Sequence, residues 1–268
     1  MYPLNIKQVC LGEGRPKICV PVMGATEEAI VSQARRAAEP PAELVEFRAD
    51  AFIGAKDTGR LLNVLKELGR ILGEKPLIFT FRTKKEGGAS DIAFQDYAAM
   101  TEAAASCGVC DIVDVEAFMD GPVISERIHD LIGHLRQKGV YVLASNHDFK
   151  KTPEKDAIVR RLWAMDAAGA DILKIAVMPA SRKDTLTLLE ATAEVYDAPV
   201  RKPLVTMAMG GLGLMSRLCG ESFGSAMTFG AVGRTSAPGQ MEAGRLKDVL
   251  DAVHHTINTI DGTIGQTE

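Results

Sequence analysis

The stretch Asp171-Ile172-Leu173-Lys174-Ile175-Ala176-Val177-Met178-Pro179 is short and apolar, and Gly169 and Pro179 bound it. Runs of this kind are typical of strands that are buried on both faces of a sheet. The run carries a single lysine, and an ammonium that is buried without a partner is costly. Lys174 is therefore expected to pair with a carboxylate, to reach solvent at the strand end, or to lose its proton. A neutral amine is a nucleophile that forms Schiff bases with ketones and aldehydes.

Seven other runs of this type occur along the chain, and helical patterns separate them. The eight expected strands span residues 17–23, 44–49, 76–82, 112–117, 140–145, 172–178, 203–208 and 226–232. Eight strand–helix repeats without a Pro/Ser-rich linker predict an α/β fold, a TIM barrel of the (β/α)₈ type with a parallel eight-stranded core, as a single domain over residues 1–268. The competing architecture is an open doubly wound sheet. Its dinucleotide-binding version has no support, because no G-x-G-x-x-G motif follows the first strand.

Polar residues mark the expected helix ends. Thr26 is predicted to begin the first helix and Asp91 to cap the third, and Thr152-Pro153 has the pattern of an N-cap with proline at the first helical position. Ser181 with Asp184 three residues later is predicted to cap the sixth helix. The last helix is expected to run from about residue 240 to 257.

The composition of the 268 residues excludes several classes of protein. Net charge is −4, from 31 Lys+Arg against 35 Asp+Glu, which is not the basic footprint of a nucleic-acid binder. No apolar run has membrane-spanning length, and the first residues lack the charged start and apolar stretch of a signal peptide. These features predict a cytoplasmic protein that has no nucleic-acid or membrane partner.

The five cysteines also agree with a reducing compartment, because their number is odd. Cys107-Gly108-Val109-Cys110 has the spacing of a redox motif or of half a zinc site. A zinc site needs a second pair of ligands, and no pair with matching spacing is present. The simpler interpretation is that these cysteines are small buried hydrophobes where a helix runs into a strand. We therefore predict no metal.

Charged residues gather toward the carboxyl ends of the expected strands, where a barrel carries its active site. Strand alternation puts Glu46 and Arg48 on one face of the second strand, and Asp114 and Glu116 on one face of the fourth. Each pair also has a purely structural explanation, as an ion pair or as core acids neutralised by arginines. The concentration of such residues at one end of five strands favours a functional site.

Two further residues extend this pattern. Arg82 ends the third strand and His147 ends the fifth. No pair among the five histidines has metal-ligand spacing, so general acid–base chemistry suits His147 best. Arginines at the mouth of a barrel predict an anionic or polyhydroxylated small-molecule ligand.

Two glycine-rich segments follow the last two strands. Gly210-Gly211-Leu212-Gly213 could cradle a phosphate, present Arg217 to a carboxylate, or form a plain turn. The segment 230–240 contains three glycines and one proline, and this composition suits a loop that folds over the mouth as a lid.

Taken together, these stretches resemble type I 3-dehydroquinate dehydratase, in order and over nearly the whole chain. The matching stretches are Glu46-Phe47-Arg48-Ala49-Asp50, Phe79-Thr80-Phe81-Arg82, Lys85-Glu86-Gly87-Gly88, Ser145-Asn146-His147-Asp148-Phe149, the strand that carries Lys174, Ser216-Arg217, Phe229-Gly230-Ala231 and Ser236-Ala237-Pro238-Gly239-Gln240. Two departures from the family are visible. Pro21 stands where some members carry a serine, and Gly210-Gly211-Leu212-Gly213 replaces charged residues of some members.

The resemblance implies a barrel, usually a homodimer, that dehydrates 3-dehydroquinate to 3-dehydroshikimate in the shikimate pathway without any cofactor. It implies that Lys174 forms a Schiff base with the substrate ketone, that His147 moves protons, and that Glu86 orients His147. The substrate-binding residues that it implies are Glu46, Arg48 and Arg82 for the ring hydroxyls, and Arg217, Ser236 and Gln240 for the carboxylate side and the lid. We also expect Arg48 and Arg82 to disfavour the ammonium form of Lys174.

Two other functions are compatible with parts of this pattern. A class I aldolase acting on a phosphorylated sugar would share the lysine of the sixth strand and could use the glycine-rich loop for phosphate. A catalytically silent binding barrel would retain the ligand pocket but not turn over. The ordered arginines and the stretch from Ser236 to Gln240 have no stated role in the aldolase, and nothing in the sequence indicates lost activity.

Overall fold

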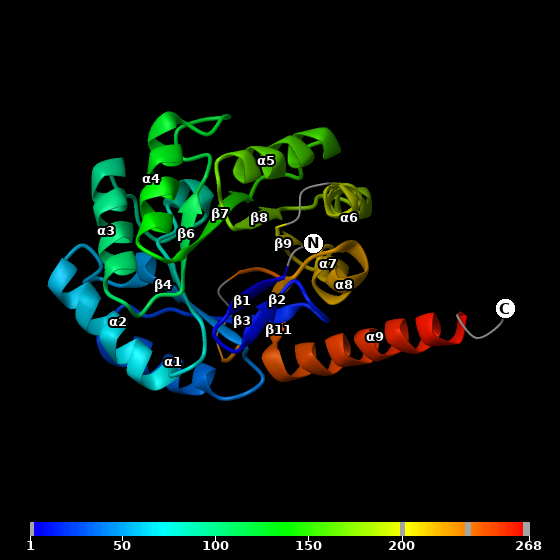
Figure 1. The fold of residues 1–268 in the computed structure, drawn as a ribbon, viewed down its shortest axis with the longest axis horizontal. Helices are drawn as coiled ribbons and strands as arrows, with labels where there is room; N and C mark the ends of the chain where they lie inside the picture. The colour runs from blue at the N-terminus through cyan, green and yellow to red at the C-terminus, as the bar shows by residue number, and fades with distance from the viewer. Residues whose placement is uncertain (1–2, 199–201, 234–236, 265–268) are drawn as a thin grey trace.

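The computed structural model describes residues 3–198, 202–233 and 237–264, and the side chains of the last helix as far as Thr259. Eight parallel strands follow one another in chain order around a barrel (Figure 1). These strands are β3 (Lys17–Val22), β4 (Leu44–Arg48), β5 (Leu77–Thr80), β6 (Ile112–Glu116), β7 (Tyr141–Asp148), β8 (Ile172–Val177), β9 (Leu204–Ala208) and β10 (Met227–Ala231). A parallel bridge between Leu204 and Ser225 joins the last two strands, and it closes the ring.

Helices α1 to α6 follow one another around the outside of the barrel, and α9 extends away to one side (Figure 1). Their bounds are α1 (Glu27–Ala38), α2 (Thr58–Leu72), α3 (Phe94–Ser106), α4 (Glu126–Gln137), α5 (Lys155–Ala167), α6 (Arg182–Asp197), α7 (Leu214–Leu218), α8 (Gly220–Phe223) and α9 (Ala243–Ile264). Short 3₁₀ turns η1 (Ala49–Ala51) and η2 (Lys84–Glu86) follow β4 and β5, and β11 (Met241–Glu242) pairs with the end of β10. None of the described helices combines the length and apolar character needed to cross a membrane.

A hairpin that precedes the barrel strands in the sequence closes one end of the barrel. Strands β1 (Leu4–Ile6) and β2 (Val9–Leu11) pair antiparallel, and Ile6, Val9 and Leu11 are buried. They share an apolar cluster with the first residues of several barrel strands, such as Leu44 and Ile172. The hairpin thus covers the amino-terminal mouth of the barrel with apolar side chains. Polar side chains can therefore gather at the carboxyl-terminal mouth, which the hairpin leaves open.

The predicted barrel and all eight predicted strands are confirmed. The strands are apolar because helices cover their outer faces and the barrel interior covers the others. Two helix starts are also confirmed: the Thr26 hydroxyl accepts a hydrogen bond from Ala29 N, and Ser181 with Asp184 forms a capping box at α6. Both caps satisfy amide groups that would otherwise lack a partner in the first helical turn.

Three local predictions were wrong. Helix α3 begins at Phe94 after Ala93, because the Asp91 carboxylate faces Lys84 (3.7 Å) instead of the helix. Helix α5 begins at Lys155 after Glu154: a residue before proline avoids helical geometry, and the chain stays extended through Thr152-Pro153. Strand β7 continues to Asp148, so His147 lies within the strand and pairs in register with Ala176.

Candidate active site

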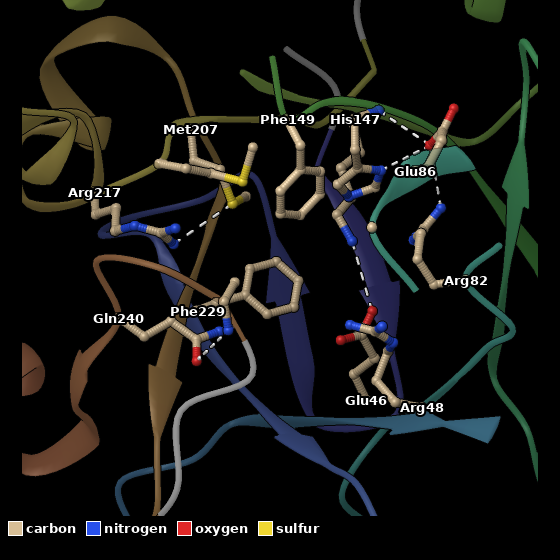
Figure 2. Close-up of a pocket in the computed structure, with 14 residues that line it drawn as sticks. Glu46, Arg48, Arg82, Glu86, His147, Phe149, Met207, Arg217, Phe229 and Gln240 are labelled. Carbon is tan, nitrogen blue, oxygen red and sulfur yellow. Dashed lines mark hydrogen bonds and ion pairs between the residues drawn. The ribbon is translucent and has the colours of Figure 1, made fainter. Parts of the chain in front are cut away.

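One cavity of about 80 Å³ lies at the carboxyl ends of the barrel strands, and we call it the strand-end cavity (Figure 2). Its polar lining comes from β4, the η2 segment, β7, β8, α7 and the loop before β11. The polar residues that line it are Glu46, Arg48, Arg82, Glu86, His147, Lys174, Arg217 and Gln240. These are eight of the nine site residues that the sequence predicts; the ninth, Ser236, lies outside the described residues.

Lys174 is the third residue of β8 and is only 3% exposed. Its Nζ lies 3.4 Å from Asp114 Oδ2 and 3.5 Å from Glu46 Oε1, and 4.7 Å from the centre of the Phe229 ring. Carboxylates, and not arginines as expected from the sequence, are thus the charged groups in direct contact with this amine. Because the strand holds the backbone and the cavity wall holds the side chain, the amine has a fixed position in the cavity.

Arg48 and Glu46 alternate along β4, but their roles differ. Arg48 makes two hydrogen bonds to the buried carboxylate of Asp50, at 2.8 and 3.0 Å. Although burial alone would raise the pKa of Asp50, the Arg48 guanidinium lowers it below its ordinary range. Glu46 accepts a hydrogen bond from the Thr80 hydroxyl (2.9 Å), which orients it beside Lys174.

Arg82 is the centre of a buried ionic network. Its guanidinium donates to Asp114 (2.6 Å), Glu116 (3.2 Å), Glu86 (3.4 Å) and the Ser145 hydroxyl (2.8 Å). Burial would raise the pKa of Asp114, but Arg82 and Lys174 lower it below its ordinary range. The Asp114 carboxylate is therefore held ionised beside the cavity.

His147 and Glu86 form the acid–base pair of the cavity. Glu86 Oε2 lies 2.9 Å from His147 Nδ1 and accepts a hydrogen bond from the His147 backbone N–H (3.0 Å), and Glu86 Oε1 accepts from Asn146 Nδ2 (3.0 Å). Figure 2 shows the two side chains facing each other on one side of the cavity. The contact occupies Nδ1, so Nε2 is the ring nitrogen left for chemistry.

The electrostatics of this pair favour the uncharged form of each side chain. Burial, with the nearby Glu116 carboxylate, raises the pKa of Glu86 to about 8 against the influence of Arg82. Burial lowers the pKa of His147 well below its ordinary value, and the cations of Arg82 and Lys174 lower it further. A neutral imidazole that carries its proton on Nδ1, toward Glu86, leaves Nε2 as a free base, which is the form a general base requires.

Arg217 lies on the opposite wall of the cavity from His147 and Glu86 (Figure 2). It is 2% exposed, and the described residues offer its guanidinium two neutral partners: Met207 Sδ at 3.5 Å and the Pro238 carbonyl oxygen at 3.3 Å. Its Nε has no hydrogen-bond partner, and among the described residues no carboxylate forms an ion pair with it. Burial alone lowers the pKa of Arg217 to about 10. A buried guanidinium whose N–H groups are only partly hydrogen-bonded is suited to binding an anion.

The loop after β10 packs against the glycine-rich segment that follows β9. Gly210 N donates to the Pro238 carbonyl oxygen (3.2 Å), and a side chain at Gly239 would collide with the Gly210 backbone at 2.6 Å. A side chain at Gly213 would meet the Ala208 carbonyl oxygen at 2.2 Å. These glycines therefore allow close backbone approach, which supports the plain-turn interpretation of Gly210-Gly211-Leu212-Gly213.

Several residues of the site were not among those predicted. Asp114, Glu116, Ser145 and Asn146 hold the charged side chains, and the first two were noticed only for their shared strand face. The signal that could have found them is their position on β6 and β7, the two strands that follow β5 and Arg82 in barrel order. In the described part of the chain no group of three or more His, Cys, Asp or Glu has metal-binding geometry, and all five cysteines are free.

The family of the chain follows from a match over most of its length. Residues 18–257 match the family model for type I 3-dehydroquinase. The chain belongs to this family. It is therefore a type I dehydratase of 3-dehydroquinate, a hydro-lyase.

Relatives and solved structures of type I 3-dehydroquinase agree with this assignment. The chain is 43% identical to 3-dehydroquinate dehydratase of Clostridioides difficile, over 95% of this chain and 98% of the relative, and 45% identical to that of Listeria monocytogenes, over 95% and 99%. A crystal structure of the type I enzyme from Clostridium difficile with covalent modified comenic acid has a TM-score of 0.89 at 41% identity, covering 95% of this chain and 98% of that one. The enzyme from Geobacillus kaustophilus has a TM-score of 0.90 at 35% identity, covering 94% and 96%.

Proposed function

We propose that the chain dehydrates 3-dehydroquinate to 3-dehydroshikimate through a Schiff base on Lys174, with His147 as general acid and base. The observation that carries the proposal is that a buried amine, a His–Glu pair and an anion receptor line one small cavity. Arg217 would bind the substrate carboxylate, since it lacks an anionic partner among the described residues. The substrate ring would then lie between Arg217 and Lys174, with His147 beside it.

The first half of the reaction makes an electron sink. The neutral amine of Lys174 adds to the substrate ketone, and loss of one water together with uptake of one proton gives a cationic imine. Since the amine contacts Glu46 and Asp114, these carboxylates are available to stabilise the cationic imine at the same position. The positive charge that imine formation creates on this nitrogen therefore lies beside two carboxylates.

The second half removes water from the ring. His147 Nε2 takes a proton from the carbon next to the imine, and the electron pair is stored as an enamine. The enamine expels the hydroxyl β to the former ketone, which takes a proton from His147 and leaves as water. Water then hydrolyses the conjugated imine and frees Lys174. A positioned general base contributes about 10²–10⁴-fold to such a step.

Two features support the assignment of roles. Glu86 orients His147 through Nδ1, and its other oxygen is held by Asn146. The related Clostridium difficile enzyme was solved with covalent modified comenic acid, which supports a nucleophile in a site of this kind. The aldolase alternative has no support from the comparisons, and the glycine-rich loop that suggested its phosphate site is explained by backbone packing.

The test combines an absorbance assay for enone formation with chemical trapping. Enzyme and 3-dehydroquinate are mixed with a metal chelator, and a borohydride-quenched sample is analysed by peptide mapping. We expect turnover and a reduced adduct on the peptide that contains Lys174. Lys174→Ala should lose both, while Lys155→Ala, which removes a surface partner of Glu190 and Glu194, should keep both. A near-normal rate in Lys174→Ala would contradict the imine mechanism.

The family resemblance also leads us to propose a cytoplasmic homodimer that works in the shikimate pathway as a single folded domain. Light scattering coupled to size-exclusion chromatography tests the dimer. Loss of growth without aromatic amino acids on deletion of the gene tests the pathway. A monomer at micromolar concentration would contradict the first of these expectations.

A further inference from the structure

A second cavity lies on the other side of the Glu86–His147 pair, and we call it the rear cavity. It has a volume of about 210 Å³, and Glu86 and His147 line both it and the strand-end cavity. Its other lining residues include Lys85, Phe118, Gly121, Asn146, Asp148 and Arg161. The acid–base pair is therefore a partition between two cavities, and the dehydration mechanism uses only one of them.

Direct contacts hold this partition in place from the rear. Asn146 Nδ2 donates to Glu86 Oε1 (3.0 Å), and Arg161 donates to Asn146 Oδ1 (2.9 Å). Arg161 also lies over the Phe118 ring, 5.8 Å from its centre. Because each group in this chain has its partner, the rear wall keeps one geometry whether or not the strand-end cavity is filled.

The rear cavity is suited to water. Its lining includes two cations, two carboxylates and an amide, and Lys85 and Pro122 at its rim are exposed to solvent. Lys85 itself donates to the carbonyl oxygens of Phe118 (3.0 Å) and Met119 (2.8 Å), which keeps the rim open at a fixed width. A polar cavity of this size holds several water molecules, since each occupies about 30 Å³ in the liquid.

The chemistry of the site creates a need for such a cavity. Once a substrate fills the strand-end cavity, His147 Nε2 faces the substrate and bulk water no longer reaches it from that side. The proton that His147 removes from carbon can then return to carbon or pass to the departing hydroxyl, and it exchanges with water only if the pair passes a proton on through Nδ1 and Glu86. Glu86 lines the rear cavity and lies 2.9 Å from His147 Nδ1, so it can pass a proton between the ring and that cavity.

We propose that the rear cavity is the proton-exchange port of the enzyme, through which water exchanges protons with the Glu86–His147 pair while the strand-end cavity is occupied. The inference rests on the proposed function, because it needs His147 to abstract a proton. In the outward step Glu86 releases its proton to water in the rear cavity. Nε2 gains the proton from carbon, and Nδ1 gives its proton to the ionised Glu86 Oε2, which restores the uncharged carboxyl. No electrons are transferred, and the inward step is the reverse.

Gly121 allows the port to be blocked without touching the pair. A Cβ at this position meets no heavy atom within 4 Å, and its backbone is not in the left-handed region, so larger residues are tolerated. Gly121→Leu and Gly121→Phe fill the rear cavity by increasing amounts. Gly133→Phe is the matched control, because a Cβ at Gly133 on α4 also meets nothing within 4 Å and Gly133 lines neither cavity.

The measurement uses 3-dehydroquinate deuterated at the carbon that loses its proton. After partial conversion in ordinary water, mass spectrometry gives the loss of label from unreacted substrate relative to the product formed. We expect this ratio to fall about tenfold or more in Gly121→Phe, within the range that proton transfer contributes, and less in Gly121→Leu. Because the port is blocked, the deuteron on His147 returns to carbon instead of exchanging with water. Gly133→Phe should match the wild type.

The two proposals fail in different ways. If the wild type gives neither product nor a borohydride adduct on Lys174, the proposed function is wrong. If the wild type does both but the exchange ratio is the same in all four proteins, the rear cavity is not the port. Adduct formation on Lys174 should be retained in both Gly121 variants, and this retention shows that the strand-end cavity remains intact. Should Gly121→Phe fail to fold, Gly121→Leu still has to lower the ratio.

Discussion

Arg82 and Arg217 are both about 2% exposed and both reach the strand-end cavity, yet their surroundings are opposite. Arg82 contacts three carboxylates, whereas among the described residues Arg217 has none. Burial alone would lower the pKa of each guanidinium. At Arg82 the three carboxylates raise the pKa well above its ordinary value, and at Arg217 burial acts alone and lowers the pKa to about 10.

This difference separates two uses of a buried cation. A guanidinium with its full set of anions is part of the folded structure, because it compensates the charges that the strands bury. A guanidinium without an anion costs free energy in the empty enzyme, and that cost is recovered when an anionic ligand binds. We therefore interpret Arg82 chiefly as a residue that organises Asp114, Glu116 and Glu86, and Arg217 as the residue that binds substrate.

The largest expected effect is on stability, at Arg82. Arg82→Met leaves Asp114, Glu116 and Glu86 without their shared cation, and removal of one partner from a buried ionic network costs about 3–5 kcal/mol. Urea unfolding at neutral pH measures the loss. Arg70→Met is the control, since Arg70 is exposed and pairs only with Glu67 on the same helix. A loss below about 1 kcal/mol, the range of a surface pair, would contradict the structural role.

A smaller effect, of the opposite kind, is expected at Arg217. Arg217→Met should leave the free energy of unfolding unchanged or increase it, because an uncompensated buried charge is removed. It should raise KM by about 30-fold or more, since loss of one partner of a buried charge pair costs about 2 kcal/mol or more. Initial rates over a range of 3-dehydroquinate concentration give KM, and Arg217→Lys should restore part of the affinity. An unaltered KM would show that the carboxylate binds elsewhere.

Much of this arrangement was predictable from the sequence. The eight strands were found because parallel strands read as continuous apolar runs, and Lys174 and Glu46 were found because a charge inside such a run is conspicuous. The hairpin of β1 and β2 was missed, because three-residue strands are too short to show a period. Asp91 was assigned a cap that it does not form, since Lys84 competes for its carboxylate.

The partners of the charged residues could not be predicted in this way. Arg82 was expected to bind ring hydroxyls, and its contacts with Asp114 and Glu116 depend on the distance between β5 and β6, which no single-strand pattern contains. The rear cavity depends in the same way on side chains from β7, α5 and two loops. Sequence patterns give the face of a strand on which a residue lies, but the residues that meet across strands are decided by the closed barrel. The single-domain boundary and the role of Ser236 stay predictions.

The last expected effect is a change of the free energy of unfolding with pH that arises from Glu86, a carboxyl in contact with Arg82. The pKa of Glu86 is raised from about 4.5 to about 8, so the folded protein holds a proton that the unfolded chain releases. This contribution to stability is complete below pH 4.5 and is lost as the pH rises toward 8, with a slope of at most about 1.4 kcal/mol per pH unit. The lowered pKa of His147 acts in the opposite direction below pH 6.5. Urea unfolding between pH 5 and 8 should therefore show a steeper decline above pH 6.5 in the wild type than in Glu86→Gln, which cannot ionise. Equal slopes would mean that Glu86 is already ionised in the folded protein at pH 5, held by Arg82, Asn146 and the His147 amide, and that the pair then holds one proton, on the histidine, instead of two.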